Sequence, residues 1–154
     1  MYDNFDKAYE ILKKTGTTDQ VIMKGKVALY QLRSDFGQYL NEVYFMPVIN
    51  LNDKGAEQTI EEYIKEFKPV AFEFIFHNEE SRYLDRFKDI RKKGSRVWVN
   101  SLWESLNAGY EDDMALKNPD SIYGWYLNKG VNMIQTDRPQ LLINYLKSKD
   151  LHLQ

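Results

Sequence analysis

The chain has 154 residues, of which 43% are hydrophobic and 29% are charged, and its formal net charge is −2. These values are typical of a single globular domain and argue against a disordered or membrane-spanning chain. The chain has no cysteine, which excludes disulfides and thiolate zinc sites. Its Lys and Arg residues are balanced by nearby acids, which argues against a dedicated surface for nucleic acid or anionic membranes.

Apolar stretches of strand length alternate with amphipathic stretches of helix length along the chain. The opening helix is expected at residues 3–15, and five strands follow at residues 21–26, 45–50, 70–76, 96–101 and 131–137. The intervening helices are expected at residues 30–40, 56–67, 81–93, 121–128 and 139–147, and residues 102–120 are expected to form a long acidic loop. This alternation predicts an α/β fold with a parallel sheet and right-handed crossovers.

The two faces of the predicted strands differ in polarity. Because side chains alternate along a strand, Phe72, Phe74 and Phe76 share one face and Glu73 lies on the other. The second face carries Lys24, Lys26, Glu73, Trp98, Asn100 and Gln135. A sheet with helices on both faces has nearly continuous apolar strands, so helices are expected on one face only. The pattern therefore predicts consecutive βα units of a (β/α) barrel, with the polar face toward the lumen.

The last strand–helix unit reads GVNMIQTDRPQLLINYL, from Gly130 to Leu146. Pro139 fits the first position of a helix, and Thr136 or Asp137 can accept hydrogen bonds from free helix amides. This segment resembles the final unit of the glycerophosphodiester phosphodiesterases, which typically reads G-V-D-G-I-I-T-D-x-P before a leucine-rich helix. RVWVNSL, at residues 96–102, resembles the W-T-V-N strand of the same family, with Asn100 at the position of its asparagine.

The resemblance implies a TIM barrel like that of the PI-PLC-like phosphodiesterases. On this mapping residues 1–154 are a single partial domain that holds strands four to eight of a (β/α)8 barrel, with the first three strands absent. The family's H-R, E-x-D, H-D and E-x-K motifs, which supply acid/base histidines and carboxylate ligands for a cation, do not occur in this chain.

We therefore expect the C-terminal part of a glycerophosphodiester phosphodiesterase, a hydrolase of glycerophospholipid metabolism that converts a glycerophospho-alcohol into glycerol phosphate and an alcohol. No catalytic residue and no metal ligand are expected in this chain, and the isolated chain is expected to be inactive. The resemblance implies calcium or magnesium in the intact enzyme. No targeting signal is found in the chain, so cytoplasmic and extracytoplasmic locations both remain open for the intact protein.

Six residues are candidates for substrate binding. Lys24 or Lys26 would contact a phosphate, or else form a solvated strand end. Glu73 would either bind substrate or pair with one of these lysines across the lumen, because a buried carboxylate needs a partner. Trp98 and Trp103 would line a cleft for the alcohol or pack within the barrel, and Asn100 matches the family motif.

An alternative function is a non-catalytic α/β half-barrel module that assembles with itself or with a companion half-barrel. Its open sheet face and free strand edges would favour self-association or binding of a missing N-terminal half. The acidic segment Glu111–Asp113 lacks the spaced oxygen donors and the glycine of a calcium loop, and it is expected to be a solvated loop.

Overall fold

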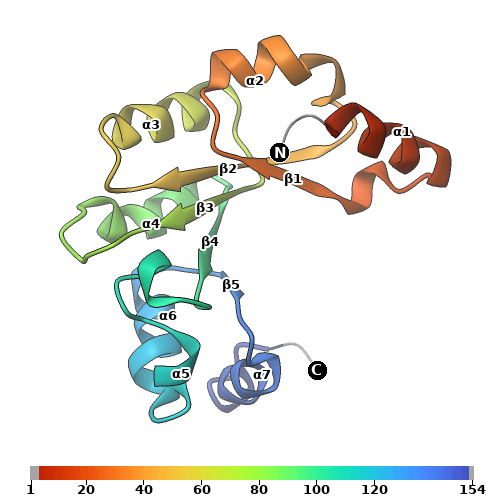
Figure 1. The fold of residues 1–154 in the computed structure, drawn as a ribbon. Helices are drawn as coiled ribbons and strands as arrows, with labels where there is room; N and C mark the ends of the chain where they lie inside the picture. The colour runs from red at the N-terminus through yellow and green to blue at the C-terminus, as the bar shows by residue number, and fades with distance from the viewer. Residues whose placement is uncertain (1–3, 153–154) are drawn as a thin grey trace.

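The computed structural model describes residues 4–152 and contains one sheet of five strands in the order β1-β2-β3-β4-β5 (Figure 1). The strands are β1 (Ile22–Gly25), β2 (Tyr44–Asn50), β3 (Ala71–Ile75), β4 (Arg96–Asn100) and β5 (Met133–Gln135). Every neighbouring pair is parallel. The predicted α/β class and parallel sheet are therefore confirmed.

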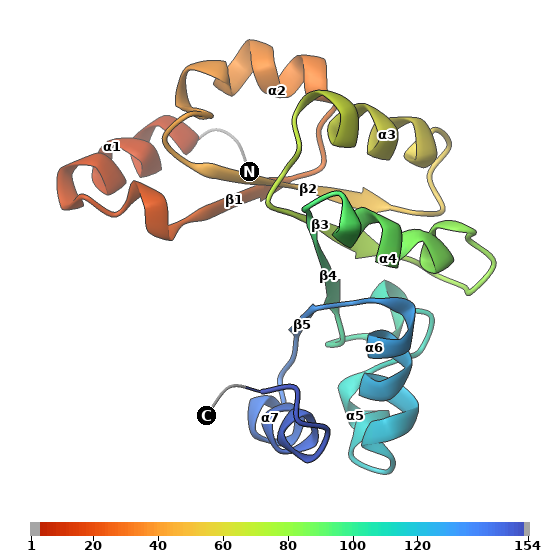
Figure 2. The same cartoon turned by 180° about the vertical axis from the view of Figure 1, so that it is seen from behind.

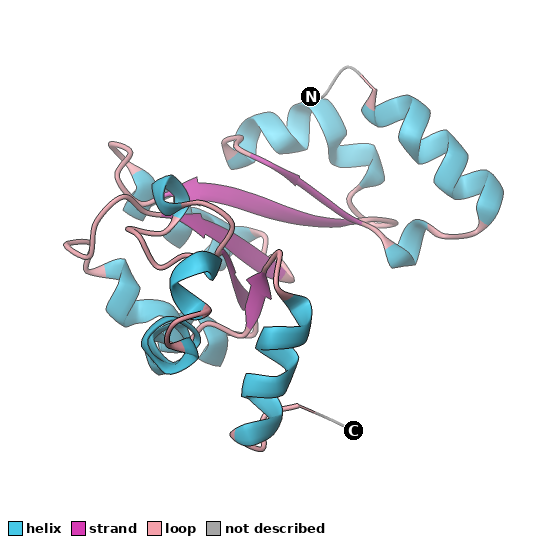
Figure 3. Cartoon of the chain, turned by 60° about the horizontal axis from the view of Figure 1, so that its bottom comes forward, coloured by secondary structure: helices cyan, strands magenta, loops and turns pink. Residues whose placement is uncertain are grey.

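The helices alternate with these strands (Figure 3). They are α1 (Phe5–Thr15), α2 (Leu29–Phe36), α3 (Ala56–Glu66), α4 (Tyr83–Lys92), α5 (Asp112–Ala115), α6 (Trp125–Lys129) and α7 (Pro139–Ser148). Asp3, the first residue predicted for the opening helix, lies outside the described residues. None of the helices within residues 4–152 has the length and apolar character needed to cross a membrane.

Several predicted boundaries, and the predicted loop, differ from the structure. α2 ends at Phe36 and continues as the 3₁₀ turn η2 (Gly37–Tyr39), where Gly37 has a low helix propensity. β5 begins only at Met133, because the side chain of Asn132 accepts the hydrogen bond of Val97 N at 2.8 Å. The predicted loop at residues 102–120 contains η3 (Glu104–Leu106) and α5, and a π-helical turn, η4 (Asp120–Gly124), precedes α6.

The main core lies between the sheet and the helices α2, α3 and α4, which follow one side of the sheet (Figures 1 and 2). Phe72, Phe74 and Phe76 are fully buried on this side. The Tyr63 ring of α3 lies 6.3 Å from that of Phe72, and the Phe87 ring of α4 lies 4.7 Å from that of Phe74. The predicted division of β3 into an aromatic face and a face with Glu73 therefore agrees with the packing.

The opening helix α1 packs against the end of α2 and the 3₁₀ turn that follows it. The ring centroids of Phe5 and Phe36 are 4.5 Å apart, and those of Tyr9 and Tyr39 are 4.3 Å apart. Both Phe5 and Tyr9 are buried by these contacts. The helix therefore extends the helical layer beyond α2.

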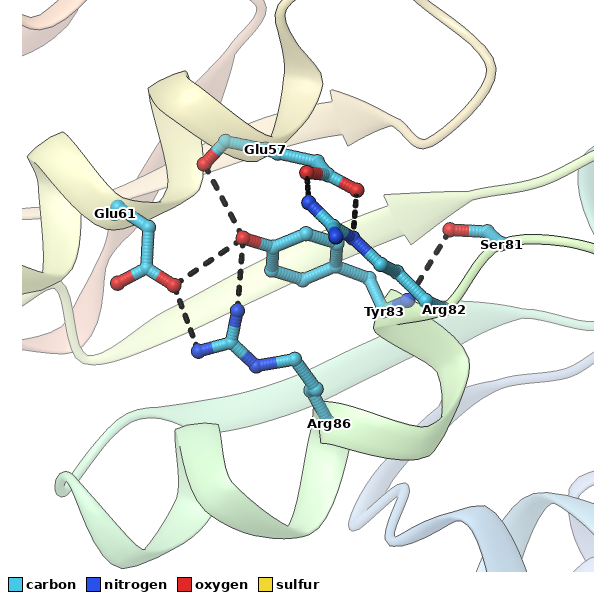
Figure 4. Close-up of polar contacts among 6 residues, drawn as sticks. All are labelled: Glu57, Glu61, Ser81, Arg82, Tyr83 and Arg86. Carbon is cyan, nitrogen blue, oxygen red and sulfur yellow. Dashed lines mark hydrogen bonds and ion pairs between the residues drawn. The ribbon is translucent and has the colours of Figure 1, made fainter.

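Polar side chains connect α3 to α4 across the helical layer (Figure 4). The hydroxyl of Tyr83 lies 3.2 Å from Glu61 Oε1 and accepts a hydrogen bond from Arg86 Nη1 at 3.1 Å. Arg86 Nη2 lies 2.7 Å from the same glutamate oxygen, and Arg82 pairs with Glu57. These contacts hold the two crossover helices in register above β2, β3 and β4.

Candidate functional site

Lys24, Glu73 and Trp98, from three different strands, meet on the sheet face opposite the Phe72–Phe74 side, and we call them the inner-face cluster. Lys24 Nζ lies 2.8 Å from Glu73 Oε2 and 5.8 Å from the centroid of the Trp98 ring. Glu73 is only 4% exposed, whereas the Lys24 side chain is 43% exposed. The cluster therefore shields its carboxylate from water and leaves its ammonium group accessible.

The strand register explains how the cluster assembles. Glu73 on β3 pairs with Trp98 on β4 and with Val48 on β2, and Lys24 on β1 pairs with Met46, two residues before Val48. Residues two positions apart on a strand share a face, so all these side chains belong to one face. In a flat sheet the backbones of β1 and β4 would be roughly 14 Å apart, so the contact of Lys24 with Trp98 spans two intervening strands.

Amide side chains occupy the same face at the carboxyl edge of the sheet. Asn100 Nδ2 donates to Gln135 Oε1 at 3.3 Å, and these two residues pair across β4 and β5. Asn50 Nδ2, at the end of β2, lies 3.1 Å from Nε2 of His77, which follows the end of β3. Polar groups from four consecutive strand ends therefore follow one another along this edge.

The other two candidate residues lie away from the cluster. Lys26 follows the end of β1, and its Nζ lies 2.6 Å from Asp53 Oδ2 in the connection between β2 and α3. Trp103 lies in the loop after β4 and is 59% exposed. The structure thus brings together Lys24, Glu73 and Trp98, places Asn100 on the same face nearer the carboxyl edge, and separates Lys26 and Trp103 from them.

Asp112 is the centre of a buried hydrogen-bond network, which corrects the expectation of a solvated acidic loop. Its Oδ1 accepts from the hydroxyls of Ser101, Tyr123 and Thr136 at 2.8–3.0 Å. Its Oδ2 accepts from Asp137 N at 2.7 Å, and the residue is 3% exposed. The carboxylate therefore joins the ends of β4 and β5 to α5 and η4.

The next acid in the sequence, Asp113, is exposed and pairs with Arg138 Nη2 at 2.7 Å. Thr136 Oγ1 also accepts from Arg138 N at 2.9 Å, which fixes the turn that leads into α7. Thr136 thus accepts from the residue that precedes α7, and neither Thr136 nor Asp137 caps the helix amides as expected, because α7 has no side-chain cap. The acceptor for the amide of Asp137, however, is the distant Asp112.

Burial raises the pKa of Tyr123, which donates to Asp112, to about 12, and the neighbouring carboxylate charge adds to the shift. Burial also raises the pKa of Tyr126, with the charge of Asp112 as a further cause. The pKa of Tyr110 is raised to about 12 by burial and by its hydrogen bond to Glu79. The two tyrosines that are influenced by the charge of Asp112, Tyr123 and Tyr126, therefore keep their protons at neutral pH.

The accessible charged group of the inner-face cluster is the ammonium of Lys24. Within residues 4–152 no group of three His, Asp or Glu residues is arranged to hold a metal ion. The carboxylate of the inner-face cluster is already paired with Lys24. What the cluster offers chemically is one accessible cation next to an indole ring, which can neutralise charge on an anionic ligand.

Sequence reasoning missed Asn50, His77 and Asp112 as members of these networks. The alternation of side chains in FMPVIN places Asn50 on the inner face, so the sequence already indicated Asn50 as a polar residue of that face. His77 directly follows the aromatic strand end, yet its partner Asn50 lies on another strand. No local signal identifies Asp112, because its partners come from three separate segments.

Comparison with known families gives one match. Residues 45–146 match the DUF4996 family, which is described as a domain of unknown function. The matched range covers β2 to most of α7, and it includes Glu73, Trp98, Asn100 and Asp112. A comparison with curated proteins finds no match.

Proposed function

The chain belongs to the DUF4996 family, and we propose that it forms the C-terminal part of a barrel of the glycerophosphodiester phosphodiesterase type, where it supplies strands four to eight. The observation that carries this proposal is the inner-face cluster. Helices cover one side of the parallel sheet, and Lys24, Glu73 and Trp98 converge on the other. Enzymes built on (β/α) barrels place their reactive groups at the carboxyl end of such a lumen.

In this proposal Lys24 contacts the phosphoryl oxygens of a glycerophosphodiester. Glu73 holds the ammonium group in place through their 2.8 Å contact, and Trp98 presents an apolar surface to the substrate. The positive charge of Lys24 would stabilise the negative charge that grows on the phosphoryl group during hydrolysis. Asn100 and Gln135 would offer amide groups to the hydroxyls of the glycerol part.

Hydrolysis also needs an activated nucleophile and a protonated leaving group. The glycerophosphodiester phosphodiesterases supply the nucleophile and the proton through histidines and carboxylates of strands one to three. In the intact enzyme a divalent cation neutralises the phosphoryl charge. This chain has two histidines in all, and His77 is engaged with Asn50 at the sheet edge. We therefore propose that the chain binds and positions substrate and that it does not hydrolyse the substrate alone.

The test compares this chain with a longer one. The coding region upstream of the Met1 codon is searched for an in-frame segment that carries the H-R, E-x-D and H-D motifs, and the extended chain is expressed. Release of glycerol phosphate from glycerophosphocholine is then measured with calcium or magnesium, with and without a chelator. We expect chelator-sensitive release by the extended chain, loss of most activity in its Lys24→Ala variant, and no release by the present chain.

Two results would contradict this function. Rapid, chelator-sensitive release by the present chain would show that its own residues are sufficient. An extended chain that carries the motifs but remains inactive on several glycerophospho-alcohols would remove the substrate assignment. As a control, Lys117→Ala, at an exposed position after α5, should leave the activity of the extended chain unchanged.

The second candidate function is a non-catalytic half-barrel module, and one observation favours it. Ile22 and Tyr44 pair at the free edge of the sheet and are 39% and 48% exposed. Exposed apolar side chains on and next to an edge strand, here Ile22 on β1 and Tyr44 on β2, are a typical point of association. Absence of the three motifs upstream of Met1, together with a stable self-assembly of this chain, would favour the module over the enzyme part.

A further inference from the structure

A cavity of about 300 Å³ lies between the carboxyl ends of β1 and β2 and the beginnings of α2 and α3. It lies outside the inner-face cluster, because none of Lys24, Glu73 and Trp98 lines it. Its walls come from both strand–helix connections and from the facing turns of the two helices, which lie side by side in Figures 1 and 2. The polar residues among its lining are Lys26, Gln31, Asn50, Asp53, Lys54 and Thr59.

The charges that line the cavity favour an anion. Lys26 and Lys54 contribute two positive charges, and Asp53 contributes one negative charge. Asp53 is engaged with Lys26 at 2.6 Å, which fixes the position of that ammonium group. Lys54 makes no ion pair with any residue in the described part of the chain. One positive charge therefore remains uncompensated at the cavity.

The neutral groups of the lining suit a ligand that also carries hydroxyls. Thr59 Oγ1 donates to Gly55 O at 3.2 Å, so its lone pairs remain available to a hydroxyl donor. The side-chain amide of Gln31 has no hydrogen-bond partner in residues 4–152. Neither α2, which begins after Ala28, nor α3, which begins at Ala56, has a side-chain cap. Ala56 N donates to Asp53 O at 3.1 Å, and the following first-turn amides add further donors.

We propose that this cavity binds a small phosphorylated polyol, with the phosphate next to Lys26 and Lys54 and the hydroxyl-bearing part next to Gln31 and Thr59. A volume of about 300 Å³ is sufficient for a ligand of this size. The site is formed by β1, β2, α2 and α3 alone, so it does not depend on the proposed phosphodiester hydrolysis or on any absent strand.

The proposal is tested by titrating the ¹⁵N-labelled chain with inorganic phosphate or with glycerol 3-phosphate and measuring its amide chemical shifts. Glycerol is the uncharged control. We expect saturable shifts at Ala28, Gln31, Ala56 and Thr59 with both phosphates, tighter binding of glycerol 3-phosphate, and no effect of glycerol. Loss of a charge-assisted contact costs roughly tenfold in affinity, and this is the weakening expected for Lys26→Gln and for Lys54→Gln.

The matched control is Lys65→Gln, which removes an exposed lysine from the last turn of α3 and should leave the affinity unchanged. Lys26 and Lys54 are exposed, so both variants should keep the circular dichroism spectrum of the parent chain. Equal weakening in all three variants would reveal non-specific attraction and overturn the proposal. Shifts centred on Lys24 and Glu73 would also overturn it, and they would leave the proposed function of the inner face intact.

Discussion

At the residue scale, Asp112 shows how one buried carboxylate can organise an irregular segment. Four donors from three segments converge on its two oxygens. A buried charge is tolerated only when hydrogen bonds replace its lost water, and here every donor lies within 3.0 Å. The loop after β4 is therefore folded around this residue and supports the ends of β4 and β5.

Substitution of Asp112 should accordingly destabilise the chain. An asparagine at this position accepts through one oxygen only, so at least one of the four buried donors loses its partner. We expect Asp112→Asn to lower the free energy of unfolding by about 2–4 kcal/mol in a urea titration. Asp113→Asn, at the exposed neighbouring position, should change it by less than about 1 kcal/mol. Equal effects of the two substitutions would disprove the role of the network.

The raised pKa of Tyr123 predicts a loss of stability at alkaline pH. The folded chain holds this proton up to about pH 12, whereas an unfolded tyrosine releases it near pH 10. The stabilisation is therefore complete below pH 10 and is lost as the pH rises through 12.

Urea unfolding measured at a series of pH values from 9 to 12 tests this expectation. The parent chain should lose stability steadily over the range, and Tyr123→Phe, which cannot ionise, should flatten the decline. The control is Tyr30→Phe, because Tyr30 is 74% exposed, and this variant should retain the decline of the parent. An unchanged slope in Tyr123→Phe would refute the assignment.

Part of the candidate site was predictable from single residues. A charged residue inside an apolar strand needs a partner, and the alternation of β1 and β3 places Lys24 and Glu73 on one face, so their pairing was one of two stated readings for Glu73. The position of Lys26 was not predictable, because its partner Asp53 lies beyond the end of another strand. Asp112 escaped for the same reason, since long-range contacts determine its burial.

At the element scale, the strands were predictable because each is an apolar run between turn residues or charges. The helices with a regular amphipathic pattern were predictable as well. Both α3, at Ala56, and α7, at Pro139, begin at the expected residue. The segment at residues 102–120 was not, because its order depends on contacts such as the hydrogen bond from Asn107 Nδ2 to Asn100 O at 2.8 Å. Local propensity contains no information on such contacts.

The contact between α3 and α4 gives a prediction for a single hydroxyl. Tyr83 is 2% exposed, and its hydroxyl contacts Glu61 and Arg86 from within the helical layer (Figure 4). Removal of this group in Tyr83→Phe should lower the free energy of unfolding by about 1 kcal/mol, because two polar partners lose a neighbour. The exposed Tyr30→Phe again provides the control, and a neutral result for Tyr83→Phe would show that Glu61 and Arg86 are sufficient.

At the scale of the whole molecule, the sheet has a free edge at β1 that no described element pairs with. The open sheet face was expected to favour self-association, and the structure exposes only part of the apolar residues on that face. Ala71 is fully buried, and Ile75 and Trp98 are half-buried, whereas Ile22 and Tyr44 at the edge remain well exposed. On the inner face, the exposed apolar surface therefore lies mainly at Ile22 of β1 and Tyr44 of β2.

We predict that the chain does not persist as a monomer in solution and that it associates through this edge. Unpaired strand groups next to Ile22 and Tyr44 can pair with a second copy, or with the strands of a companion half-barrel, and association removes the apolar pair from water. Light scattering after size-exclusion chromatography should give a mass above 18.3 kDa that falls on dilution.

Ile22→Lys, which places a charge on the edge, should shift the equilibrium to the monomer. Ile11→Lys, at a 62% exposed position on α1, should not. A single species near 18.3 kDa that unfolds cooperatively and binds no hydrophobic dye would show that the isolated sheet needs no partner.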